Sequence, residues 1–484
     1  MSHSSVHGAY PPTDGRHAEA FGARNLLQRA NEQARRLGDW LVRHQGTVRG
    51  LQWCIVALYV ALLAVPAVLP LPDGTAHILG NLTLLAQFVF WGIWWPFVLL
   101  SMVIVGRSWC GFFCPEGTLT EFASRFGQGR ALPRWLTWGG WPFVAFACTT
   151  IYGQMVSVYQ YPKPVVVVLG GSTLAAIVVG LRYGRNKRVW CRYLCPVNGV
   201  FALLAKISPL HFRVDPLAWR ASQRRHEHPA MINCAPLVAI RTMRGSGDCH
   251  MCGRCSGFRD AVALSVRAPN DEIVKVAGTR TNPWESVLII FGLMGIALGA
   301  FHWSASPWFV AVKQSIAEWL IDHRIIWPLE TSAPWWLLTN YPQQNDVLTL
   351  LDGAVLIGYI LTTALVAGAV LTGLLAVATR VLGGWSWRRF HHLTQTLVPL
   401  AGCGVFLGLS ALSVTMLRHE GFALAWVGFA RAGLLVGAAA WSTWLAWRVS
   451  GLSAPGASRG LATACVALAS AFGVGGWVLM FWVW

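Results

Sequence analysis

The sequence predicts an all-α polytopic membrane protein of about nine transmembrane helices with one small polar insert. Only 12% of its 484 residues are charged and 55% are hydrophobic, whereas soluble globular domains carry about 25% charged residues. The hydrophobic residues gather in several runs of about 20, the length that an α-helix needs to cross the hydrocarbon core. The 27 tryptophans fit the same class, because their amphipathic rings settle at membrane interfaces.

The net charge of +18 does not indicate a nucleic-acid-binding protein. The basic residues are not gathered in one patch; they recur between the apolar runs. This distribution is typical of membrane topology, because Lys and Arg accumulate in cytoplasmic loops. We therefore expect contact with membrane lipid and no binding of nucleic acid.

The chain divides into two membrane regions and two polar segments. Residues 1–48 form a basic arm without a leading apolar stretch, which predicts a cytoplasmic segment rather than a signal peptide. Within this arm, residues 26–44 have helical apolar spacing and are expected to lie along the membrane surface. The nine candidate spans are about 51–71, 84–105, 135–155, 164–181, 286–303, 351–378, 395–416, 424–446 and 461–483. The first four spans belong to a membrane core at 49–206, and the last five belong to a C-terminal membrane region at 285–484.

Two connections between spans are long. Residues 207–284 form a polar, Arg-rich insert, and residues 304–350 contain an amphipathic helix followed by a Trp- and Pro-rich loop. Lys and Arg concentrate on the side of the amino terminus and the insert. The bias predicts that both lie in the cytoplasm and that residues 304–350 lie on the opposite side of the membrane.

An internal repeat links the first four spans. WCGFFCPEG at 109–117 and WCRYLCPVN at 190–198 share the pattern W-C-x3-C-P, and each follows an even-numbered span. Duplicated hairpins with weak internal similarity are common in membrane proteins. The repeat predicts two hairpins, each ending in a cysteine pair on the cytoplasmic side. The i, i+4 spacing at a helix end turns both sulfurs of a pair to one face.

A third cysteine motif lies in the insert, in GDCHMCGRCSGFRDAV at 247–262. Its C-x2-C-x2-C spacing allows a tight loop to point three thiolates into one concavity around an inorganic cube. A bacterial ferredoxin run would continue with x3-C-P, but Arg259 occupies that cysteine position. The fourth ligand must therefore come from another part of the chain. Cys234, in the same insert, is the nearest candidate, and Cys114 and Cys195, each followed by proline, are the alternatives.

Eight of the twelve cysteines are predicted to face the cytoplasm, where thiols stay reduced. This group of cysteines therefore indicates metal binding rather than disulfides. Eight thiolates meet the ligand demand of two [4Fe–4S] clusters. The predicted ligands are Cys110, Cys114, Cys191, Cys195, Cys234, Cys249, Cys252 and Cys255. The remaining cysteines lie within apolar runs and are expected to pack as small hydrophobic side chains. Structural zinc is the alternative, but it favours paired C-x2-C knuckles, which the triplet does not form.

The paired C-x3-C-P motifs followed by a cysteine-rich insert resemble the NapH/NosR/CcoG-type membrane polyferredoxins, over about residues 80–265. The resemblance implies a multi-pass protein of the bacterial inner membrane that binds [4Fe–4S] clusters. It also implies electron transfer between the quinone pool or the cytoplasm and a periplasmic or membrane-bound redox partner. Family members support nitrate or nitrous-oxide reduction, metal reduction or assembly of copper enzymes, and related proteins accompany ferrous-iron permeases.

Taken together, the patterns predict an electron-transfer component of an oxidoreductase system rather than a stand-alone catalyst. Because both clusters are expected on one face of a barrier of about 30 Å, a further carrier is required: quinone, haem or a cofactor of a partner. None of the 14 histidines lies deep in a predicted span, and His77 and His302 lie at span ends. A zinc-binding assembly factor and a permease-associated subunit are the alternative functions. The scarcity of ionisable residues within the spans disfavours a transporter.

Overall fold

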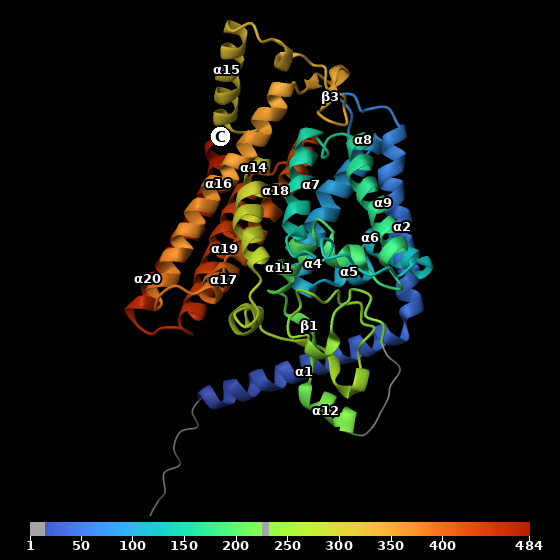
Figure 1. Ribbon diagram of the computed structural model, residues 1–484, viewed down its shortest axis with the longest axis vertical. Coiled ribbons are helices and arrows are strands. Elements are labelled where there is room, and N and C mark those ends of the chain that lie inside the picture. Colours follow the sequence, from blue (N-terminus) through green and yellow to red (C-terminus); the bar gives the residue numbers. More distant parts are fainter. Residues whose placement is uncertain (1–14, 225–231) are drawn as a thin grey trace, which may run out of the picture.

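Figure 1 shows a bundle of long helices with smaller elements at both of its ends. The computed structural model describes residues 15–224 and 232–484. Residues 1–14 of the predicted basic arm and residues 225–231 of the predicted insert lie outside the described residues. Within the described ranges helices predominate, and the strands form two short antiparallel pairs. The predicted all-α class is confirmed.

Seven helices among the described residues are long and apolar enough to cross a membrane. They are Gln45–Val68 (α2), Leu82–Val105 (α3, η1 and α4), Pro162–Tyr183 (α8, η3 and α9), Pro283–His302 (α13, η7 and α14), Leu350–Val381 (α16), Val398–His419 (α18) and Ala457–Val483 (α20 and η10). Four of these helices contain π-helical turns, at Phe88–Trp94, Val166–Gly170, Leu288–Ile296 and Leu479–Val483. Such turns shift the faces of a helix relative to each other without ending it.

Helices also occupy the two other predicted spans, but neither is among the seven. α7 (Trp141–Met155) has 15 residues, a length of about 22 Å, which is shorter than a hydrocarbon core of about 30 Å. α19 (Trp426–Ser450) has 25 residues but includes Arg431 and Arg448. Both run alongside the long helices in Figure 1. The predicted count of nine spans therefore stays a prediction.

The end of the bundle that carries the cysteine motifs is called the cysteine side, and the opposite end is called the far side. The short helices of the cysteine side are α5 (Ser108–Phe112), α6 (Pro115–Ala123), α10 (Val189–Tyr193) and α11 (Asn198–Ala205). The insert adds β1 (Leu210–Val214), α12 (Pro216–Arg224) and β2 (Val262–Val266). Strands β1 and β2 pair antiparallel, and Phe212 lies opposite Leu264. Both side chains are buried and form a small core for the insert.

α1 (Gly15–Arg43) covers this insert, as Figure 1 shows near the lower end of the bundle. The side chain of Asn31 accepts a hydrogen bond from the backbone N–H of Val266 at 2.8 Å. Ser256 and Asp39 are hydrogen-bonded at 3.1 Å, and Ala34 belongs to the core of the insert. The amphipathic helix predicted within residues 26–44 thus packs its inner face on protein rather than only on a membrane surface.

The far side carries α15 (Pro307–Asp322) and a short hairpin of β3 (Asn340–Tyr341) and β4 (Asp346–Val347). The predicted amphipathic helix of the 304–350 loop is therefore present as α15. It stands beside the far-side end of α16 in Figure 1, and Lys313 forms an ion pair with Asp352 at 2.5 Å. The buried Asp352 also caps α16 through Thr349.

One hydrophobic core joins the two predicted membrane regions. It contains Val98 and Leu204 from the first region together with Leu375 and Val398 from the second. A polar contact supports the junction on the cysteine side, where Lys206 donates to Glu285 at 2.5 Å and to Gln395 of α17 (Trp387–Gln395) at 3.1 Å. The C-terminal region is consequently packed onto the half of the chain that carries the cysteine motifs.

Candidate metal centre

The two W-C-x3-C-P motifs have the same backbone structure. In the first motif, the N–H groups of residues 113 and 114 both donate to the carbonyl of Trp109 at 2.9 Å. In the second, the N–H groups of residues 194 and 195 both donate to the carbonyl of Trp190, at 2.9 and 3.0 Å. Each short helix thus closes in a tight turn immediately before the proline, whose ring cannot continue the helix. The internal repeat read from the sequence is a repeat of local structure.

The structure divides the eight predicted ligands into two groups. The first set is Cys110, Cys114, Cys191 and Cys195, and the second set is Cys234, Cys249, Cys252 and Cys255. Members of each set lie close enough for the charge of one thiolate to act on the next. The second set includes Cys234, so the structure places this cysteine, and not Cys114 or Cys195, with the triplet.

The first set lies at the base of the membrane helices. Burial raises the pKa of Cys191 to about 12, and the nearby Cys110 acts in the same direction. Burial also raises the pKa of Cys114, with further contributions from Cys191 and Cys110. The Sγ atom of Cys114 accepts from the backbone N–H of Gly117 at 3.4 Å, in the first turn of α6. Four thiolates gathered away from water require compensating positive charge, as a metal group provides.

The second set is built by the loop 247–257 and by the segment around Cys234. Burial raises the pKa of Cys249 to about 12, and Cys252 and Cys234 add to the effect. The backbone turns through left-handed conformations at Met251 and Gly253, which curl the loop around its sulfurs. The N–H of Met251 donates to the Sγ atom of Cys249 at 3.4 Å. Hydrogen bonds of this kind to ligand sulfurs are typical of iron–sulfur loops.

The Cys234 segment is held against the second W-C-x3-C-P motif. The N–H of Arg188 donates to the carbonyl of Ala235 at 2.8 Å. Lys187 donates to the carbonyl of Cys234 at 3.1 Å. The insert is therefore attached to the membrane core at Cys234. This attachment explains how Cys234, which is remote from the triplet in sequence, lies beside the three triplet cysteines.

The two sets are neighbours. Gly111, between the two cysteines of the first motif, packs against the triplet loop: a Cβ atom there would lie 2.4 Å from the carbonyl oxygen of His250 and 3.0 Å from the Cα of Cys252. The repeat has Arg192 at the position equivalent to Gly111. Arg192 also reaches the triplet segment, through Asp248 at 2.5 Å. This difference between the two copies was the sequence signal that could have located the contact.

Two arginines occupy equivalent positions three residues before the first cysteine of each motif, and both are buried. Arg107 donates to the carbonyl of Gly247 at 2.6 Å and lies 3.8 Å from the Sγ atom of Cys110. Arg188 donates to the carbonyl of Cys110 at 2.6 Å, and its charge acts on Cys191 and Cys252, one from each set. Positive charge next to both sets would stabilise the reduced form of a cluster bound there.

No three His, Cys, Asp or Glu side chains within residues 15–224 and 232–484 gather tightly enough to hold a single metal ion. In a [4Fe–4S] cluster each thiolate binds a different iron, so the ligand sulfurs stand apart around the cube. The observations that favour such a group are the four-thiol composition of each set, the N–H donors on two sulfurs and the adjacent arginines. The chemistry of the donors therefore fits [4Fe–4S] binding.

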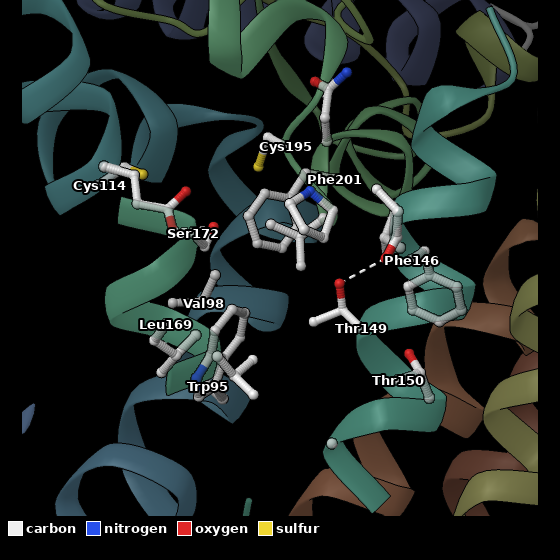
Figure 2. A pocket seen from close by; sticks show the side chains of 18 of the residues that line it. Trp95, Val98, Cys114, Phe146, Thr149, Thr150, Leu169, Ser172, Cys195 and Phe201 are labelled. Atoms are coloured by element: carbon white, nitrogen blue, oxygen red, sulfur yellow. Dashed lines mark hydrogen bonds between the residues drawn. The ribbon is translucent and has the colours of Figure 1, made fainter. Parts of the chain in front are cut away.

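A cavity of about 720 Å³ opens beside the first set. Figure 2 shows Cys114 and Cys195 near one end of it, with Leu169 and Ser172 on one wall and Phe146 and Thr149 on another. Most of its lining is aromatic or aliphatic, and it reaches residues near the far-side end of α7.

The polar groups of this cavity are few. Glu116 accepts from Ser172 at 2.6 Å and from the indole N–H of Trp190 at 3.0 Å, and burial raises its pKa. His250 also lines the cavity. An apolar pocket with a few convergent polar groups is the usual form of a small-molecule or cofactor site.

The sequence comparisons agree with this site. A model of the 4Fe-4S binding domain matches residues 87–133 and 167–215, the two segments that contain the paired motifs. Together with the relatives described below, this match supports a protein of the membrane polyferredoxin type. The resemblance read from the motifs is thereby confirmed, as are iron–sulfur binding and electron transport as the area of function.

Three curated relatives are described as electron transport or ferredoxin-type proteins. The chain is 24% identical over 251 residues to the putative electron transport protein YccM of Escherichia coli, a match that covers 46% of this chain and 68% of that protein. It is 25% identical over 168 residues to the methylamine utilization ferredoxin-type protein MauN of Paracoccus denitrificans and 31% identical over 124 residues to MauN of Methylorubrum extorquens. These matches cover 31% and 23% of this chain and about half of the MauN proteins, 56% and 42%. No solved structure matches the chain.

A buried ion pair supports the site, and its loss is expected to destabilise the protein strongly. Arg188, with 2% of its side chain exposed, pairs with Glu121 at 2.7 Å, and Arg254 pairs with the same carboxylate at 2.6 Å. Glu121→Gln leaves Arg188 without a counter-charge, which costs about 3 kcal/mol of unfolding free energy. Thermal unfolding in detergent at pH 7 measures the loss.

The same pair gives a pH dependence of defined sign. Burial by itself would raise the pKa of Glu121, but Arg188 and Arg254 outweigh it and lower the pKa. The stabilisation is therefore present above the unfolded-state pKa and is lost as the pH falls through the lower folded-state pKa. In Glu121→Gln the free energy of unfolding should therefore fall less steeply as the pH is lowered. The control Glu32→Gln breaks an exposed pair with Arg36 and should change stability by less than about 1 kcal/mol; an equal effect of both variants would contradict the prediction.

Proposed function

We propose that the protein transfers single electrons through two [4Fe–4S] clusters on the cytoplasmic face of the bacterial inner membrane. The observation that supports this most directly is the division of eight cysteines into two adjacent groups of four. When bound, each cluster supplies a one-electron carrier. The chain holds the thiolates, places arginines beside them and excludes water from the first set, in which Cys110 and Cys191 are only 8% and 7% exposed.

The arrangement supports an order for the two carriers. The second set lies in the insert, away from the membrane helices, and the first set lies at their base beside the cavity. Gly111 and Cys252 bring the two backbones into contact. In the proposed path, electrons pass between a cytoplasmic source and the second set, then between the two sets, and then between the first set and a carrier in the membrane.

A quinone is the carrier that the cavity supports best. Its largely apolar walls include the aromatic side chains of Trp91, Trp94 and Trp95, and it lies among membrane helices where a lipid-soluble ring can enter. The cavity also approaches the far side near Tyr152 and Tyr159. Delivery to a periplasmic or membrane-bound redox partner is part of this proposal, as is the crossing of the membrane by α7 and α19.

Anaerobic purification tests the proposed cofactors. We expect about eight irons and eight acid-labile sulfides per chain, with broad visible absorbance that dithionite bleaches and a paramagnetic signal from the reduced clusters. A colourless protein with stoichiometric zinc would overturn the proposal and favour the assembly-factor alternative.

Impermeant maleimide tests the orientation in the same study. Thr242 in the insert and Thr331 in the far-side loop are both exposed, so each can be replaced by cysteine as a reporter. We expect Thr331→Cys to react in intact spheroplasts and Thr242→Cys to react only after lysis. The reverse pattern would place the cysteine side outside the cytoplasm.

A further inference from the structure

His250 belongs to one cysteine motif by sequence and to the other by position. It stands between Cys249 and Cys252 of the second set. Nevertheless it lines the cavity beside the first set, which none of the three triplet cysteines does. Its carbonyl oxygen touches Gly111, within the first motif. Among the described residues of the insert, His250 is therefore the one that lines the cavity of the first set.

The imidazole of His250 is buried without any hydrogen-bond partner in the described chain. The residue is 2% exposed, and neither Nδ1 nor Nε2 has a partner. Leaving such a buried polar group unsatisfied costs about 1–3 kcal/mol. A cost of this size indicates that the ring has a hydrogen-bond partner that the described chain does not supply. A metal group bound at this centre is such a partner.

The surroundings define the chemistry of that partner. The charged groups that act on the ring are Arg107, Arg188 and Arg192. Guanidinium groups only donate hydrogen bonds, so none of them can accept the ring N–H. Among the described residues, no negatively charged acceptor is hydrogen-bonded to the ring. The sulfides and thiolates of a cluster at the first set would supply one.

We propose that His250 donates an N–H hydrogen bond to a sulfur of the cluster held by the first cysteine set, so that the insert helps to set the reduction potential of the membrane-side cluster. This inference rests on the proposed function, since it requires that cluster. His250 acts here as a positioning and tuning residue, not as a ligand, because each set already contains four thiolates.

Redox titration of two variants tests the proposal. His250→Met fills the space without a donor, and His250→Gln keeps an N–H donor. Both should retain about eight irons. In His250→Met the reduced-to-oxidised ratio of one cluster at a fixed potential should fall about tenfold, a shift of ~59 mV to lower potential, because hydrogen bonds to cluster sulfurs raise the potential. His250→Gln should restore part of the difference, and the second cluster should keep its potential.

The matched control is His211→Met. His211 lies on β1 of the same insert, also has an unpartnered ring nitrogen, and is absent from the cavity lining. Both cluster potentials should be unchanged in this variant. An equal shift in His211→Met and His250→Met would show a general effect of the insert and overturn the inference.

A measurement on the unaltered protein does not depend on how the variants fold. With histidine labelled by ¹⁵N, pulsed EPR of the reduced protein should show weak nitrogen coupling on one cluster signal, and His250→Gln should abolish it. Strong coupling, or loss of about four irons in both His250 variants, would identify a ligand and overturn the donor role. Unchanged potentials together with no coupling would also overturn it. Absence of clusters from the unaltered protein would instead refute the proposed function.

Discussion

Replacement of Cys234 by alanine is expected to remove about four of the eight irons from the protein. Cys234 lies with the triplet of the second set, so its loss leaves one iron of that cluster without a thiolate ligand. The first set is separate and should keep its cluster. Iron and sulfide analysis after anaerobic purification measures the change, and EPR should show that one of the two signals persists.

The control for this variant is Cys403→Ala. Cys403 lies in α18, packed against the hydrophobic core, and its replacement should leave the iron content unchanged. Full retention of iron in Cys234→Ala would mean that the triplet does not use Cys234, which would return the fourth position to Cys114 or Cys195. Loss of all iron would mean that the two clusters do not assemble independently.

Replacement of Gly111 by valine is expected to separate the insert from the membrane core. The atoms that a side chain would meet belong to the backbone at His250 and Cys252, at 2.4 and 3.0 Å. Backbone cannot rotate away as a flexible side chain can, so the triplet loop must shift. We expect a loss of about 1–3 kcal/mol in unfolding free energy and selective loss of the cluster in the second set. Thermal unfolding and iron analysis measure both effects.

Gly171→Ala is the matched control for Gly111→Val. Gly171 is helical, and a Cβ atom there meets nothing within 4 Å. Alanine should leave the iron content unchanged and keep or raise stability by up to about 1 kcal/mol, because it restricts the unfolded chain. A fully loaded and equally stable Gly111→Val protein would show that the contact between the two sets is dispensable.

Features of local origin could be predicted from the sequence. The long apolar runs predict membrane helices because every backbone polar group in lipid must be paired within its own segment. Likewise, the W-C-x3-C-P pattern predicts cysteine pairs at helix ends, because the i, i+4 spacing and the following proline act within a single turn. The two copies have the same hydrogen bonds around Trp109 and Trp190.

Features that depend on contacts between distant segments could not be read in this way. The pairing of Cys234 with the triplet depends on hydrogen bonds from residues 187 and 188. The position of α1 depends on the insert, whose edge it covers through Asn31. The length of the apolar run also predicted a longer helix than α7. The run 135–155 includes residues before Trp141 that form turns rather than helix.

The sequence alone determined the membrane class, the repeated hairpins and the eight sulfurs available for metal, because helix length, proline geometry and ligand chemistry are properties of short stretches. Only the tertiary structure decided how the sulfurs divide into two sets, that Gly111 joins the sets, and that His250 reaches across to the cavity of the other set. These decisions arise from packing between segments more than 100 residues apart, such as Gly111 against His250, and residue spacing carries no information about which distant surfaces fit together.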